Sequence, residues 1–291
     1  MTYEKNTFLE TLSELAVSYS CCEKVRVQIC GDRAVLSGFL ISIPKLDLHS
    51  EFCKSAMTGF LIHECAHLRF TDFESFMPVA SDPCLCAVAK ILEDIRIERR
   101  IGLYHEIPCN ENALSDALVY MVRSGRMSFD IKKKGWDLAH CFLHFYMRSR
   151  FLKQKEIAQP AELYELLVKR QLPELYEDLT QALGCPDDPG SAFNRCAHTS
   201  HVIKLARTLV DIIIDYTDVS ESYSREHLPD ELDLSLDFDY PHFGLRKPAS
   251  PDFEREDPNE HPDTANCDLL PDISHFNACP LTHDETAGLG E

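Results

Sequence analysis

The sequence predicts a mainly α-helical protein (α+β) with one small β element near the N-terminus. Three observations lead to this fold class. Long segments place apolar residues three and four positions apart, as amphipathic helices do. One stretch, residues 25–44, is instead rich in β-branched residues and alternates between apolar and polar ones. The last quarter of the chain is acidic and rich in proline, a composition that disfavours a packed core.

The first third of the chain predicts a helix, a small sheet and two longer helices. Residues 2–20 carry apolar side chains at helical spacing. The β-branched stretch over residues 25–44 contains turn residues and predicts a hairpin or a sheet of two or three strands. Helices are then expected over residues 50–69 and 82–101, the second of which stops at Gly102.

The middle of the chain is predicted to be almost entirely helical. Prolines mark the helix boundaries, because proline lacks the backbone N–H that a helix interior requires. The expected helices cover residues 110–124, 136–153, 160–171, 173–183 and 191–217. Together with the earlier elements they form one predicted domain, residues 1–218.

Residues 219–291 differ from this domain in composition. They hold 18 acidic and 4 basic side chains, together with 8 of the 16 prolines in the protein. High charge with low hydrophobicity opposes folding, so we expect an acidic tail or linker that is largely disordered. The less favoured alternative is a tail that folds back onto a metal through its acidic residues, Cys267 or Cys279.

Charge and cysteine content restrict the class of protein. The formal net charge of −19 opposes binding to nucleic acids and to anionic membranes. The chain shows neither a membrane-helix segment, which needs roughly 18 apolar residues, nor the features of a secretory signal. The 13 cysteines form no C-x-x-C pair, which argues against a disulfide framework or a zinc ribbon. We therefore expect a cytoplasmic protein with reduced thiols.

The helix expected over residues 50–69 contains an H-E-x-x-H motif that begins at His63. His63 and His67 lie on one helical face, so both imidazoles can bind a single tetrahedral Zn²⁺. Glu64 lies about 100° around the helix from His63, where it can reach a metal-bound water. Zinc lowers the pKa of such a water to about 7, and Glu64 can then accept its proton as the general base.

A third protein ligand is usual at a catalytic zinc, and residues 90–102 offer three carboxylates. At about 100° per residue, Asp94 and Glu98 fall on the polar side of this helix. There we expect them to be solvated or to hydrogen-bond the ligands. Glu93 falls on an apolar flank, where a lone charge is costly to bury. A metal would offset that cost, so Glu93 is the expected third ligand. Arg96 needs a partner for the same reason, and a structural ion pair is expected.

Five more residues are candidates for supporting roles. Asp72 is expected either to accept a hydrogen bond from an imidazole or to be only a loop residue. A hydrogen bond to a tetrahedral oxyanion is expected from one of Tyr104, His105, His140 and His144, among which the sequence does not choose. For His140 and His144, which are four residues apart, we favour core or groove positions over a second metal site.

The pattern H-E-x-x-H-x-x-x-T-D-F, followed by I-L-E-D-I-R-I-E at residues 91–98, resembles a bacterial and phage family described as cobaltochelatase T-subunit-like. The resemblance is strongest over residues 60–102 and extends only in helical character to about residue 218. It implies a zincin-like domain, an acidic linker, a von Willebrand A domain and an AAA+ ATPase as partner. The D-x-S-x-S motif of the von Willebrand A domain is missing, which predicts a short member of the family or its N-terminal part.

The expected ligand set also resembles that of the glutamate-zincin metallopeptidases. It departs from the thermolysin-like pattern, because Ile97 stands where an aspartate follows the ligand glutamate by four residues. The family description does not establish cobalt chelation, and a complete H-E-x-x-H motif favours a peptidase-like site.

Two functional hypotheses from different classes follow. The first is a zinc-dependent metallopeptidase that hydrolyses a peptide or protein substrate with a zinc-bound water that Glu64 activates. The alternative is a non-hydrolytic adaptor, in which the metal stabilises the helical domain and the protein acts with an AAA+ ATPase in a chelatase-like or chaperone-like complex.

Overall fold

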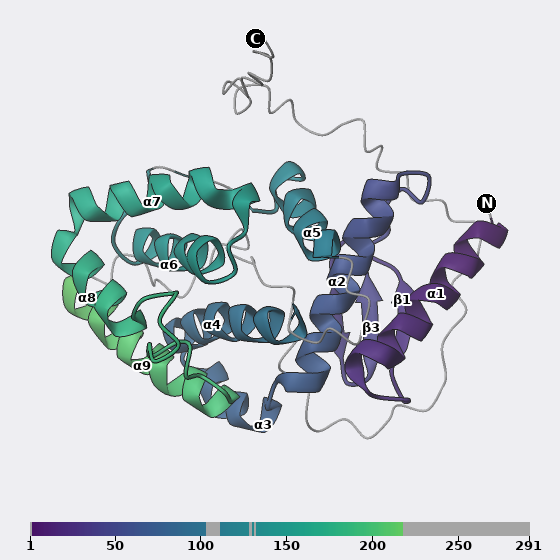
Figure 1. The fold of residues 1–291 in the computed structure, drawn as a ribbon, viewed down its shortest axis with the longest axis horizontal. Helices are drawn as coiled ribbons and strands as arrows, with labels where there is room; N and C mark the ends of the chain where they lie inside the picture. The colour runs from purple at the N-terminus through teal and green to yellow at the C-terminus, as the bar shows by residue number, and fades with distance from the viewer. Residues whose placement is uncertain (1, 103–110, 128–129, 131, 218–291) are drawn as a thin grey trace, which may run out of the picture.

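The computed structural model describes residues 2–102, 111–127, 130 and 132–217. Within these ranges the protein is mainly helical, with nine α-helices and a three-stranded sheet near the N-terminus (Figure 1). The predicted fold class is therefore confirmed. In this part of the chain, no helix has the length and apolar character needed to cross a membrane. The predicted tail, residues 219–291, lies outside the described residues.

The sheet is the three-stranded form of the predicted β element. Its strands are β1 (Arg26–Ile29), β2 (Val35–Ser37) and β3 (Leu40–Ile43). β3 is central, pairing in parallel with β1 and antiparallel with β2. The tight turn from β2 to β3 requires Gly38, whose φ of 59° is a conformation that other residues rarely adopt. Helix α1 (Thr2–Ser20) packs against this sheet and against the helix that carries the histidine motif.

That helix, α2 (Glu51–Phe70), begins where the hydroxyl of Ser50 accepts a hydrogen bond from the backbone N–H of Cys53. Residues 59–67 of α2 are all buried, because α1, α4, α5 and the sheet surround it. Its contact with α5 (Glu111–Arg123) is so close that a methyl group at Gly59 would overlap the backbone of Ala113. The motif helix is thus fixed on several sides.

Helix α4 (Pro83–Gly102) lies between two hydrophobic cores. Its first half, through Ile95, packs into a core formed with the helices α6–α9. Ile97 and Ile101, near its end, belong to a second core formed with α1, the sheet, α2 and α5. The polar residues at the middle of α4 therefore lie where the two cores meet.

The remaining elements are short α3 (Phe73–Phe76), the 3₁₀ helices η1 (Met77–Ser81) and η2 (Lys155–Ile157), and the helices α6 (Gly135–Phe151), α7 (Ala158–Gln171), α8 (Pro173–Leu183) and α9 (Thr199–Tyr216). Most predicted helices agree with these bounds within two residues. The exception is the last one, predicted to begin at residue 191. The side-chain amide of Asn194 donates to the carbonyls of Pro186 and Asp188, at 2.9 and 2.6 Å, and so stabilises a loop there instead.

Candidate metal centre

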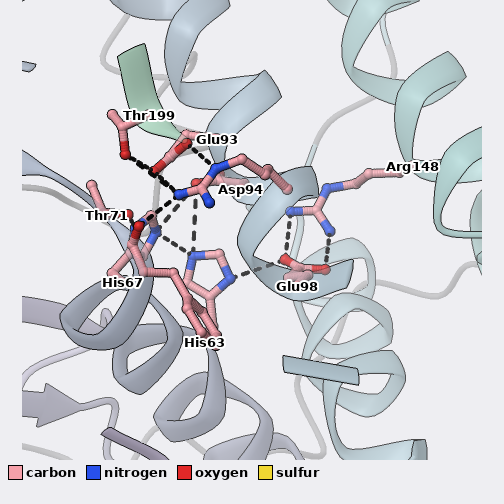
Figure 2. Close-up of polar contacts among 10 residues, drawn as sticks. His63, His67, Thr71, Glu93, Asp94, Glu98, Arg148 and Thr199 are labelled. Carbon is pink, nitrogen blue, oxygen red and sulfur yellow. Dashed lines mark hydrogen bonds and ion pairs between the residues drawn. The ribbon is translucent and has the colours of Figure 1, made fainter. Parts of the chain in front are cut away.

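The two histidines of the H-E-x-x-H motif lie side by side on α2, as predicted from their spacing. Both side chains are buried, with 2% of each exposed. Their Nε2 atoms are 3.0 Å apart. Figure 2 shows both imidazoles directed toward the same small region between α2 and α4.

Asp94 of α4 supplies a carboxylate to this region (Figure 2). Its Oδ1 lies 3.2 Å from Nε2 of His67 and 3.9 Å from Nε2 of His63. Tetrahedral zinc bonds of about 2.0–2.1 Å place neighbouring ligand atoms about 3.3 Å apart. The spacing of these three atoms therefore fits one divalent metal ion, and in the described part of the chain this is the one His/Cys/Asp/Glu group that does.

Both imidazoles are oriented through their other ring nitrogen. Nδ1 of His63 lies 2.9 Å from Oε1 of Glu98, and Nδ1 of His67 lies 3.0 Å from the hydroxyl of Thr71. An ionised carboxylate can only accept, so Nδ1 of His63 donates, and in the neutral imidazole this leaves the lone pair on Nε2. This is the tautomer that a metal ligand needs.

The electrostatics favour a bound cation. Burial would raise the pKa of Asp94, but its hydrogen bond with His67 and the neighbouring imidazoles lower it below the ordinary value. Burial lowers the pKa of His67 to about 4, against the opposing effect of Asp94. Burial also lowers the pKa of His63, but the hydrogen bond with Glu98 and the nearby carboxylates raise it more. At neutral pH, Asp94 is ionised and His67 is neutral, which are the forms that bind metals.

The structure brings Asp94, and not the predicted third ligand Glu93, next to the two imidazoles. The Glu93 carboxylate is buried, as expected, but Arg96 of the same helix binds both of its oxygens at 2.6 and 2.7 Å. The hydroxyl of Thr199, at the start of α9, donates to it at 2.9 Å. The cost of burying Glu93 is therefore offset by Arg96, for which an ion pair was predicted, and not by a metal.

Glu98 lies within hydrogen-bond distance of Nδ1 of His63, one of the two motif histidines. It is not solvated, because only 6% of it is exposed and Arg148 of α6 binds both of its oxygens. Burial would raise its pKa, but the charge of Arg148 and the hydrogen bond from His63 lower it to about 2. The polar side of α4 thus faces other helices, where the sequence alone suggested solvent.

Glu64 is buried beside His63, with 1% exposed, and its negative charge contributes to the raised pKa of that histidine. Cys65 lies on another side of α2, where its thiol contacts the carbonyl of Ala16 at 3.7 Å. Asp72 takes the loop role, because its carboxylate accepts from the backbone and hydroxyl of Ser75. Thr71, the residue before it, contacts the imidazole instead.

His140 and His144 are buried core residues of α6, as favoured by the sequence. Burial lowers the pKa of His140 to about 4 and that of His144 to about 3. His144 lies close enough to Asp94 and Glu98 for their charges to act on its pKa. Within the described residues, Nε2 of His144 and Nδ1 of His140 have no hydrogen-bond partner. The other two oxyanion candidates, Tyr104 and His105, lie outside the described residues.

Sequence reasoning missed Arg148 and Thr71. One signal was present for Arg148: it continues the spacing of His140 and His144 by four residues, so the three share one stripe of α6. None of the protein-family models, curated proteins or solved structures compared with the chain matches it.

Proposed function

We propose that this protein is a zinc-dependent hydrolase of the metallopeptidase type, with His63, His67 and Asp94 as the zinc ligands. One observation carries the metal: Nε2 of His63, Nε2 of His67 and Oδ1 of Asp94 come from two helices and meet at the spacing of ligand atoms around one ion. Two imidazoles and a carboxylate are ligands that catalytic zinc accepts, and the H-E-x-x-H motif is typical of zinc hydrolases. Zinc bound there would polarise a carbonyl and acidify a water.

Glu64 is the proposed general base. It is buried directly after His63 in the chain, its charge acts on that imidazole, and in an H-E-x-x-H motif the glutamate serves as the general base toward a metal-bound water. Accepting the proton of that water would make the water a nucleophile toward a peptide carbonyl. Asp94, with 15% of its side chain exposed against 2% for each histidine, marks the side from which a substrate would approach.

His144 is the proposed donor to the oxyanion. Its depressed pKa keeps the imidazole neutral at pH 7, so it can donate one hydrogen bond without carrying a charge. Its Nε2 is buried without a partner among the described residues, and such an atom is costly to maintain unless a ligand uses it.

The burial of the site supports a second candidate, the non-hydrolytic adaptor. With both imidazoles 2% exposed and the ligands divided between α2 and α4, a metal would join the two cores as a structural crosslink. The proposal of an AAA+ ATPase partner rests on the motif resemblance.

The experiment that separates the two functions compares wild type, Glu64→Gln and His63→Ala. We expect about one zinc per chain in wild type and in Glu64→Gln, but not in His63→Ala. A glutamine cannot accept the proton, so Glu64→Gln should lose cleavage of a denatured protein or a peptide library while it keeps zinc. Wild type that holds zinc but cleaves nothing would favour the adaptor. A wild-type protein without zinc would contradict both.

A further inference from the structure

We propose that Arg148 is a positioning residue of the metal centre, acting through Glu98 on His63. The inference rests on the metal-binding part of the proposed function and does not depend on hydrolysis. Figure 2 shows the arrangement: the guanidinium of Arg148 faces the carboxylate of Glu98, whose other side faces the imidazole of His63.

The contacts of Glu98 leave its carboxylate no freedom to rotate. Arg148 donates from Nη2 to Oε1 at 3.0 Å and from Nη1 to Oε2 at 3.1 Å. Gln154 donates to Oε2 at 3.3 Å, and Nδ1 of His63 donates to Oε1 at 2.9 Å. Four donors fill the roughly four lone-pair positions of a carboxylate. The plane of Glu98, and with it the direction of His63, is therefore set by Arg148 and Gln154.

The planar fork of arginine is what this arrangement requires. Two parallel N–H groups define the orientation of a carboxylate, whereas a lysine ammonium supplies only a point charge. Gln154 also accepts a hydrogen bond from Nη1 of Arg148 at 3.3 Å, which ties the guanidinium to the chain after α6. Arg148 itself is 4% exposed, so water does not compete for these contacts.

The contacts that run from Arg148 through Glu98 to His63, called the relay below, connect parts of the protein that are distant in sequence. His63 lies on α2, Glu98 near the end of α4, and Arg148 on α6, which belongs to the other hydrophobic core. Zinc affinity should consequently depend on one side chain of α6 that never contacts the metal.

The test measures zinc dissociation constants by competition with a coloured chelator for wild type, Arg148→Met and Arg148→Lys. Removing a partner that orients a ligand weakens metal binding about 10- to 100-fold. We expect a loss in this range for Arg148→Met and a smaller one for Arg148→Lys. The visible spectrum of the Co²⁺-substituted protein should also change in Arg148→Met, because His63 no longer approaches the metal at the same angle.

Two control variants on the same helix separate positioning from general loosening of α6. Phe142→Ala removes a fully buried ring that packs against Tyr146 and Tyr176, without touching Glu98. Arg150→Met removes a half-exposed arginine that pairs with Glu165. Both should bind zinc within about twofold of wild type when measured below their unfolding transitions. If Arg148→Met does not fold, the double variant Glu98→Gln/Arg148→Met, which leaves no unpaired carboxylate, is compared with Glu98→Gln and should bind zinc more weakly than that single variant.

The outcomes separate this inference from the proposed function. If wild type binds zinc and the substitution of Arg148 does not change the zinc dissociation constant, Arg148 has no positioning role. The proposed metal centre would still stand. Phe142→Ala that weakens zinc as much as Arg148→Met also overturns it, since packing alone would then explain the effect. A wild-type protein that binds no zinc removes both proposals. Weaker zinc binding in the Arg148 variants, with zinc binding unchanged in Phe142→Ala and Arg150→Met, supports the relay.

Discussion

At the scale of single residues, the partner of each buried carboxylate determines its role. Glu93, Asp94 and Glu98 are close together on α4, yet they contact Arg96, His67 and Arg148 respectively. The helical angles placed Glu93 correctly on a buried side. They could not show that Arg96 would neutralise it, nor that the side carrying Asp94 and Glu98 would face two other helices.

Replacing the carboxylate by an amide should therefore affect a different property at each of the two positions Glu93 and Asp94. Asp94→Asn removes a charged ligand, so it should lower zinc affinity by tenfold or more with little change in the metal-free fold. Glu93→Gln leaves Arg96 buried with a neutral partner, and breaking a buried pair costs about 3–5 kcal/mol of stability at most. Chelator competition and urea unfolding of both variants test this. If Glu93→Gln lost zinc while Asp94→Asn kept it, Glu93 and not Asp94 would be the third ligand.

The buried histidines of α6 predict how stability depends on pH. In the folded protein the pKa of His144 is lowered to about 3, mainly by burial. The charged or titratable groups near it are His140 and Arg148 on α6, and Asp94 and Glu98 on α4. The unfolded chain binds this proton at about 6.5, so acid favours unfolding. The contribution of His144 is fully present above pH 6.5 and is lost as the pH falls toward 3.

The corresponding measurement is urea unfolding of the metal-free protein at pH 7, 6 and 5. Glu98, with its pKa lowered to about 2, loses its contribution only below about pH 4.5. The decline in the free energy of unfolding from pH 7 to pH 5 should consequently be smaller in His144→Gln than in wild type. Equal declines in the two proteins would show that His144 is not buried in its neutral form.

At the scale of elements, the close contact of α2 with α5 holds the motif helix in place. Glycine usually costs a helix about 1 kcal/mol relative to alanine, so Gly59→Ala would stabilise an isolated α2. In the protein the added methyl would overlap the backbone of Ala113, and overpacking costs about 1–3 kcal/mol or more. We expect net destabilisation of Gly59→Ala in urea unfolding. Gly102→Ala, where no atom of the described residues lies within 4 Å of the added methyl, is the matched control and should change stability by less than about 1 kcal/mol.

The sequence predicted elements better than it predicted contacts between them. Periodicity and prolines located α2 and α4 within one residue of their bounds, because local spacing and backbone chemistry decide where helices form. The i, i+4 spacing likewise placed His63 and His67 together. Asp94 and Arg148 depend on how three helices pack, and a single sequence carries no direct record of that packing. The start of α9 was missed because Asn194 stabilises a loop through distant carbonyls.

At the scale of the whole molecule, the described chain forms two cores that share α4. The acidic segment 219–291 lies outside the described residues, so its prediction comes from composition alone. The composition of residues 219–291 disfavours packing. We therefore expect limited proteolysis to cut within this segment and to leave a folded product close to residues 1–218. Mass spectrometry of the digest identifies the cut positions. Protection of this segment in the zinc-loaded protein, lost when zinc is removed, would indicate that it folds onto the metal centre.

The relay from Arg148 to His63 also bears on the order in which the protein matures. During synthesis the H-E-x-x-H segment leaves the ribosome first, and Asp94 follows within a few tens of residues. Arg148 emerges later, and Gln154 after it, so the nascent chain would carry the proposed zinc ligands before the group proposed to direct one of them. Ions captured early would be held loosely and exchanged freely. Tight retention would begin only when α6 has been made and docked, so the timing of translation itself would delay commitment to a metal until the fold is nearly complete.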